Sequence, residues 1–151
     1  MKLKTQIFGE IEIDEGKKLV FAQGVIGYPD YKEFFLLHDI DREGKSLISW
    51  LQSADDECFA LPVINPLMVD EAYNPVVEDE ILQRLGSMED EFAVLTTIRV
   101  PAEIEKMTVN MKAPIIVNIT TQKCCQIIVE NQGYDIRKPV YNILKDRKKE
   151  K

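Results

Sequence analysis

The sequence has 151 residues, of which 45% are hydrophobic and 30% are charged. That length fits one domain of ordinary size, which can bury a useful core. No apolar run approaches the roughly 20 residues of a membrane-spanning helix, and the amino terminus lacks the apolar core of a signal peptide. We therefore expect a cytoplasmic protein that makes no contact with a membrane.

The net charge of −7 is unevenly distributed. Residues 1–135 carry 12 basic and 24 acidic side chains, whereas residues 136–151 carry seven basic and two acidic ones. An acidic body repels phosphates, so direct binding of nucleic acid is not expected, but a basic partner would be attracted. The alternative is that the acidity only keeps the protein soluble. We expect residues 1–144 to form a single domain and residues 145–151 to form a basic, frayed tail.

Strand patterns dominate the first half of the chain. Alternating polarity on both sides of Phe8 and Gly9 predicts an opening hairpin. Two glycines and a proline predict an ordered loop over residues 24–30. Proline cannot donate a ladder hydrogen bond, so we expect either that the sixth strand is an edge strand or that Pro62 lies at the end of the strand. The predicted strands cover residues 3–7, 10–13, 18–21, 34–38, 47–51 and 58–64.

The second half of the chain contains one helix signal followed by more strands. Residues 76–85 place apolar side chains at helical spacing, with early acidic residues and a closing Gly86. Strands are predicted over residues 92–100, 107–111, 115–119 and 125–129. Residues 140–144 fit a short helix or a final strand equally well. The expected fold is mainly β, a small antiparallel β-barrel or barrel-like sandwich with one or two short helices.

Motifs for enzyme chemistry are missing from the sequence. His38 is the only histidine, and no nucleophile motif accompanies it or Cys58. The adjacent Cys124 and Cys125 should point to opposite faces of a strand, one into the core and one outward, in a reduced state. Residues 39–44 resemble the start of a calcium loop, but Trp50 occupies the position of the required glutamate. We predict no metal and no cofactor.

Three acidic triplets occupy residues 55–57, 78–80 and 89–91. Sequence adjacency does not make carboxylates face one another in a cleft, so these triplets are typical of solvated surface. They are also the places where a basic partner would dock.

Several segments together resemble the bacterial flagellar assembly factor FliW. They are residues 21–28, Trp50-Leu51-Gln52-Ser53, then Phe59, Pro62 and Asn65-Pro66, residues 108–118, Gln126 and Tyr134. The resemblance runs from about Phe8 to Arg137 in the same order. Met111 stands where leucine is expected, and Ile26 where proline is common.

The resemblance implies a regulator without enzymatic activity, with a small barrel-like fold. Such proteins bind flagellin in the cytoplasm and, when free, bind and antagonise CsrA, the RNA-binding translational repressor of flagellin. The acidic body would favour the encounter with CsrA. The alternative is a small β-barrel hydrolase or ligand-binding enzyme that uses His38 or Cys58. We expect a monomer.

Candidate partner-binding residues are acidic, amide or hydroxyl side chains near expected loops, together with two asparagines of the family pattern. The asparagines would equally well satisfy backbone groups at strand ends. The resemblance also implies a groove lined by Phe or Met, because the terminal segments of flagellin are apolar helices. The candidates are Gln52, Ser53, Asp55, Asp56, Glu71, Asn110 and Asn118.

Overall fold

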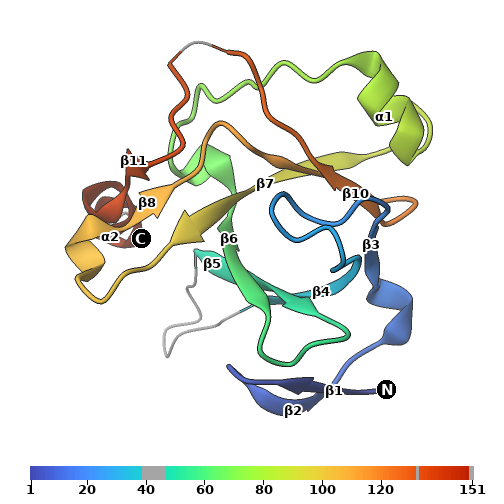
Figure 1. Cartoon of the computed structure of the whole chain (residues 1–151). Coiled ribbons are helices and arrows are strands. Elements are labelled where there is room, and N and C mark those ends of the chain that lie inside the picture. Colours follow the sequence, from blue (N-terminus) through green and yellow to red (C-terminus); the bar gives the residue numbers. More distant parts are fainter. Residues whose placement is uncertain (39–46, 132, 150–151) are drawn as a thin grey trace.

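Seven strands close into a barrel in the computed structural model, which describes residues 1–38, 47–131 and 133–149 (Figure 1). Around the barrel the order is β3-β4-β5-β6-β7-β9-β10, and β10 returns to β3. Every neighbouring pair is antiparallel except β10 with β3, which is parallel. The strands are β3 (Leu19–Phe21), β4 (Glu33–His38), β5 (Ile48–Ser53), β6 (Ala60–Ile64), β7 (Phe92–Arg99), β9 (Ile115–Asn118) and β10 (Lys123–Gln126).

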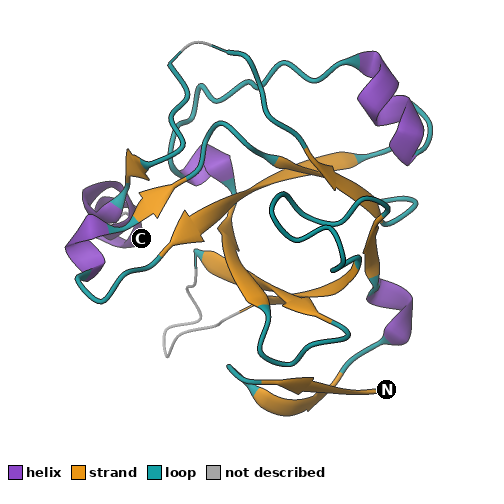
Figure 2. Ribbon diagram, viewed as in Figure 1, coloured by secondary structure: helices purple, strands orange, loops and turns teal. Residues whose placement is uncertain are grey.

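Smaller elements surround the barrel (Figure 2). Strands β1 (Lys2–Thr5) and β2 (Gly9–Glu12) form the predicted hairpin. Strands β8 (Thr108–Val109) and β11 (Lys138–Pro139) extend the sheet from β7. The helices are α1 (Asp79–Leu85) and α2 (Tyr141–Lys149), with short 3-10 turns η1 (Glu15–Lys17), η2 (Pro66–Met68) and η3 (Ile104–Lys106). The predicted class, mainly β with a small barrel and two short helices, is confirmed.

The alternating pattern of the strands fills the barrel with apolar side chains. Phe21, Phe34 and Leu51 are fully buried there, and the rings of Phe21 and Phe34 meet edge to face at 5.3 Å. Burial of each such side chain contributes about 1.5–3 kcal/mol. A second core lies under α2, where Val140 and Leu144 pack with residues of β6, β7 and β8. This packing selects the helix over the strand alternative for the final segment.

Helix α2 continues through residues 145–149, which we expected to fray. Arg147 holds it, because its Nε donates to the carbonyl of Met68 at 3.1 Å and its guanidinium pairs with Glu71 at 3.0 Å. Helix α1, by contrast, begins three residues later than its apolar pattern indicates. Glu78 is extended, and the N–H of Val76 donates to the side chain of Asn131 rather than entering a helix.

Most predicted strands lie within two residues of their observed bounds, but the predictions for Pro62 and for the strand at residues 125–129 are wrong. Pro62 lies in the middle of β6, but the pairing of β6 with β7 begins only at Val63, so proline removes no hydrogen bond from that ladder. Strand β10 ends at Gln126, because beyond it the chain leaves the barrel and residues 127–129 run beside residues 112–114. The calcium-like sequence at residues 39–44 falls outside the described residues.

Candidate functional site

The seven candidate residues do not gather on one surface. Gln52, Ser53, Asp55 and Asp56 lie where β5 ends, and Glu71 follows the far end of β6. Asn110 and Asn118 follow β8 and end β9, respectively. Gln52, Ser53 and Asn118 are buried, whereas Asp55 and Glu71 are exposed. The structure therefore separates side chains that organise loops from those that a partner can reach.

Gln52 and Ser53 hold the loop of residues 54–59 against the barrel. The Gln52 amide nitrogen lies 3.1–3.3 Å from four carbonyl oxygens, those of Ser53, Asp56, Glu57 and Phe59. The Ser53 hydroxyl oxygen accepts the backbone N–H groups of Asp55 and Asp56, both at 3.1 Å. Because neither side chain faces solvent, their role is to fix the shape of the acidic loop.

An aromatic cluster joins this acidic loop to the loop of residues 22–31. The rings of Tyr31 and Phe59 stack at 4.2 Å, and Tyr28 lies 4.8 Å from Phe59. The Tyr31 hydroxyl donates to Asp56 at 2.8 Å. This hydrogen bond is the main reason why the pKa of Asp56 is lowered and the pKa of Tyr31 is raised. Asp56 is thus held as a carboxylate beside an exposed aromatic surface.

Two glycines shape the loop of residues 22–31. Gly24 has a φ of +70°, and a side chain there would lie 2.6 Å from the backbone of Pro29, so only glycine fits. Gln126 fastens the loop to the barrel, since its side chain accepts the N–H of Ile26 at 2.8 Å and donates to the carbonyl of Ala113 at 3.0 Å. Val25 enters the barrel core as a result.

A groove of about 380 Å³ opens beside this loop. We call it the loop-end groove; its apolar lining includes Ile26, Tyr28, Leu61, Ala113 and Ile136. Neither Phe nor Met is among its described lining residues, so this groove differs from the expected one in side-chain type. Three of these side chains, Ile26, Tyr28 and Ile136, are about half exposed or more. Asn110 and Arg137 also line it, and Asn110 is the only one of the seven candidate residues that does so.

The two family-pattern asparagines each close a turn. The Asn110 side-chain oxygen accepts the N–H groups of Lys112 and Ala113. The Asn118 oxygen likewise accepts those of Thr120 and Thr121, while its nitrogen donates to Leu85 and to Asp90. The hydrogen bond from Asn118 is the main cause of the lowered pKa of Asp90. Asn118 thereby ties α1 and the following loop to β9.

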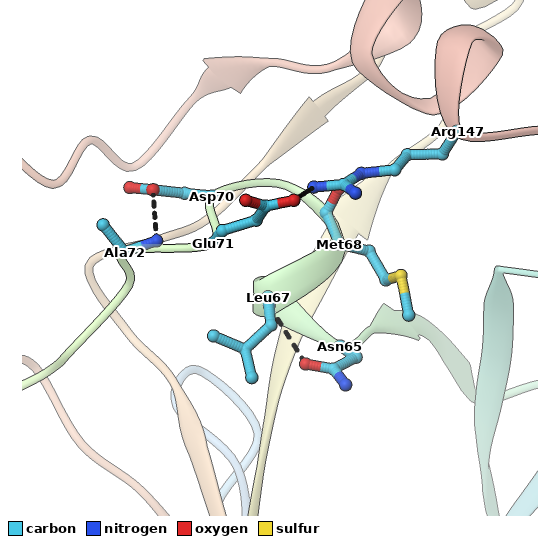
Figure 3. A network of polar contacts seen from close by, with 7 residues as sticks. All are labelled: Asn65, Leu67, Met68, Asp70, Glu71, Ala72 and Arg147. Atoms are coloured by element: carbon cyan, nitrogen blue, oxygen red, sulfur yellow. Dashed lines mark hydrogen bonds and ion pairs between the residues drawn. The ribbon is translucent and has the colours of Figure 1, made fainter. Parts of the chain in front are cut away.

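Glu71 belongs to a separate corner, formed by η2 and α2 (Figure 3). Asn65 caps η2 by accepting the N–H of Leu67, and Asp70 accepts the N–H of Ala72. The exposed side chains of Leu67 and Met68 lie between these turns. Glu71 stands at the edge of this corner, with its carboxylate on Arg147.

The side chains of the enzyme alternative lie apart. His38 ends β4 and contacts the hydroxyl of Ser49 at 2.9 Å, whereas Cys58 follows β5 near the opposite end of β4. At about 3.3 Å per residue, the four steps from Phe34 to His38 separate them by roughly 13 Å. Among the described residues, no three His, Cys, Asp or Glu side chains gather as a metal site requires.

The cysteines differ in burial. Cys124 faces the core, and burial raises the pKa of its thiol to about 12. Cys125 is half-buried rather than exposed, and burial raises its pKa as well. Cys124 is thus more buried than Cys125, as the prediction of two different faces requires, but Cys125 is not exposed as predicted. Cys58 is exposed.

The sequence interpretation did not identify the apolar side chains that are exposed at the surface, such as Tyr28, Val76 and Ile128. One signal was available for Ile128. Three consecutive apolar residues, Ile127 to Val129, must place at least one side chain on the outer face of an extended segment. The structure also contains no helix, among the residues it describes, that is long and apolar enough to cross a membrane.

Comparison with known proteins gives a consistent result. A family model described as "FliW protein" matches residues 2–140. A flagellar assembly factor FliW of Lachnospira eligens is 46% identical over 147 residues, which cover 96% of this chain and 97% of the relative. That of Lachnoclostridium phytofermentans is 44% identical over 150 residues, covering 99% and 96%. A crystal structure of the flagellar assembly factor FliW superposes with a TM-score of 0.81 at 26% identity, covering 93% of this chain and 97% of the other.

Proposed function

This chain belongs to the FliW family of flagellar assembly factors, and on that basis we propose that it couples the synthesis of flagellin to its export. In this proposal the protein binds flagellin in the cytoplasm. When flagellin leaves the cell, the freed protein binds CsrA and antagonises its repression of translation. It acts by binding, without catalysis.

The observation that carries the proposal is the loop-end groove. Flagellin must be held before assembly through segments that are apolar in the filament, and such a segment needs an apolar cleft. The groove supplies Ile26, Tyr28 and Leu61, and Gln126 fastens the wall that carries Ile26. A preformed wall reduces the ordering cost of binding, which favours a specific complex.

Charge supports the second partner. The body of the chain, residues 1–135, carries a net charge of −12, and Asp55 lies exposed in the loop of residues 54–59. RNA-binding proteins carry basic surfaces, so attraction would accelerate their association with this body. Asp55, Asp56 and Glu71 remain the candidate contacts, whereas Gln52, Ser53 and Asn118 would act through loop shape.

The test uses the purified protein with flagellin and CsrA from the same organism. Calorimetry should detect a complex with each partner, and the complex with CsrA should weaken as salt is raised. In a coupled translation assay, CsrA should repress a reporter carrying the flagellin leader. This protein should relieve the repression, and added flagellin should restore it. Failure to bind either partner would refute the proposal.

A further inference from the structure

A second groove, which none of the seven candidate residues lines, lies between residues 74–81 and residues 127–130. Figure 1 shows these two segments side by side above the barrel, one leading into α1 and the other leaving β10. The groove has a volume of about 240 Å³. We call it the acidic groove; it is lined by Val76, Glu78, Ile81, Ile128 and Glu130, with Ile127 and Val129.

Hydrogen bonds hold the two walls of the acidic groove together at one end. The N–H of Val76 donates to the Asn131 side-chain oxygen at 2.9 Å, and the Asn131 nitrogen donates to the carbonyl of Asn74 at 3.2 Å. The N–H of Asn74 in turn donates to the hydroxyl of Tyr134 at 2.7 Å. The groove is therefore a fixed feature of the fold, built before any partner arrives.

Two apolar side chains of this groove, Val76 and Ile128, face solvent, whereas Val129 is buried and Ile81 and Ile127 are half-buried. Val76 is 68% exposed and Ile128 is 64% exposed, the largest values among the exposed large hydrophobic residues of the described chain. Neighbouring exposed apolar side chains in one groove mark an interaction surface rather than a scattered surface residue. An apolar side chain inserted between them would remove both from water.

The backbone of the second wall offers an unused edge. The N–H groups of Ile127 and Val129 donate to the carbonyls of Pro114 and Lys112. Alternate residues of an extended segment point in opposite directions, so the N–H of Ile128 lies on the other edge. Within the described part of the chain it has no hydrogen-bond partner. An extended peptide could add to this edge.

The charge of the groove is negative. Glu78 and Glu130 line it, Asp79 and Glu80 follow Glu78, and all four are exposed. Only Glu80 has a cationic partner in the described structure, Arg84 at 3.0 Å. No lysine or arginine is among the described lining residues. An occupant that carries basic side chains beside an apolar one would complement both properties.

From these features we infer that the acidic groove is the docking site for the basic, RNA-binding partner. An extended segment of that partner places an apolar side chain between Val76 and Ile128, and its lysine or arginine side chains lie beside Glu78 and Glu130. This inference rests on the proposed function. The loop-end groove is lined by different residues, so substitutions in the acidic groove leave the lining of the proposed flagellin site unchanged.

The test compares two groove variants, Ile128→Ser and Glu130→Lys, with two control variants on η3, Ile104→Ser and Glu105→Lys. Ile104 is 47% exposed and Glu105 is exposed, so each control makes the same chemical change outside the groove. Purified CsrA and flagellin serve as probes in calorimetry. Thermal unfolding of each variant confirms that it is folded.

We expect each groove variant to weaken CsrA binding about ten-fold and the controls to leave it within about two-fold. The defect of Glu130→Lys should shrink as salt is raised, whereas that of Ile128→Ser should not. Flagellin binding should stay within about two-fold. Unchanged CsrA affinity in both groove variants would overturn the inference while leaving the proposed function intact. A loss confined to flagellin, or equal for both partners, would also overturn it. Absence of CsrA binding by the wild type would overturn both.

Discussion

Replacing Asn118 with alanine should destabilise the fold without removing a contact to a partner. The side chain is completely buried and makes four hydrogen bonds. Three of them reach backbone groups of Leu85, Thr120 and Thr121 at 2.9–3.1 Å. The substitution therefore releases the turn after β9 and loosens the loop after α1 in one step.

The size of the effect follows from what replaces these bonds. The carbonyl of Leu85 keeps the hydroxyl of Thr121 at 2.6 Å, and water can reach the backbone of the exposed Thr120 and Thr121. Few buried polar groups are therefore left without a hydrogen-bond partner. The loss per hydrogen bond is then its net contribution to stability, about 1 kcal/mol. The three backbone bonds together give a loss of about 3 kcal/mol in the free energy of unfolding.

Urea unfolding measures this loss directly. The midpoint urea concentration should fall, while the slope of the unfolding free energy against urea concentration should stay unchanged. Asn142→Ala is the matched control, because Asn142 is exposed on α2 and its replacement should change stability by less than about 0.5 kcal/mol. Below the unfolding transition, the Asn118→Ala variant should bind flagellin and CsrA as the wild type does. A stable variant that has lost a partner would show that Asn118 is a contact residue and refute the reasoning.

Three further outcomes follow from the site. Gln52→Leu removes the amide that reaches four carbonyls, so the loop of residues 54–59 should exchange its amide hydrogens faster while the barrel strands do not. The lowered pKa of Asp56 stabilises the fold above the pKa of the unfolded chain, about 3.9, and that stability is lost as the pH falls through the folded value. Tyr31→Phe should therefore show a smaller drop in Tm between about pH 6 and about pH 3 than the wild type. A thiol reagent should label Cys58 rapidly in the native protein and Cys124 only after unfolding, and Cys58→Ser should abolish the rapid phase.

Several strands of this fold are readable from the sequence as apolar runs of strand length. Residues 34–38 and 47–51 are two such runs on either side of a polar segment, and β4 and β5 lie there. The start of α1 was not readable in this way. The apolar spacing from Val77 continues into the helix, but Asn131, which accepts the N–H of the preceding Val76, lies 55 residues from Val76. Local periodicity carries no information about such a partner.

The candidate site shows the same limit. Amide and acidic residues near loops are found both where a partner is bound and where a side chain holds a loop in shape. Only burial distinguishes Gln52, which holds a loop, from Asp55, which a partner can reach. The acidic groove combines Glu78 with Ile128, which lie in different segments. Its walls meet only in the folded barrel, so the triplet at residues 78–80 alone gave no reason to prefer it over the other two.

The single parallel pair, β10 with β3, has a consequence for how the chain is made. Val20 and Lys123 lie about one hundred positions apart, so the ring cannot close until Lys123 has left the ribosome. Until then the free edges of β3 and β7 are exposed to other nascent chains, and closure over so long a loop is slow. Gln126 and Glu130, one in each groove, are translated later still. Both grooves are therefore complete only after residue 130 has been synthesised.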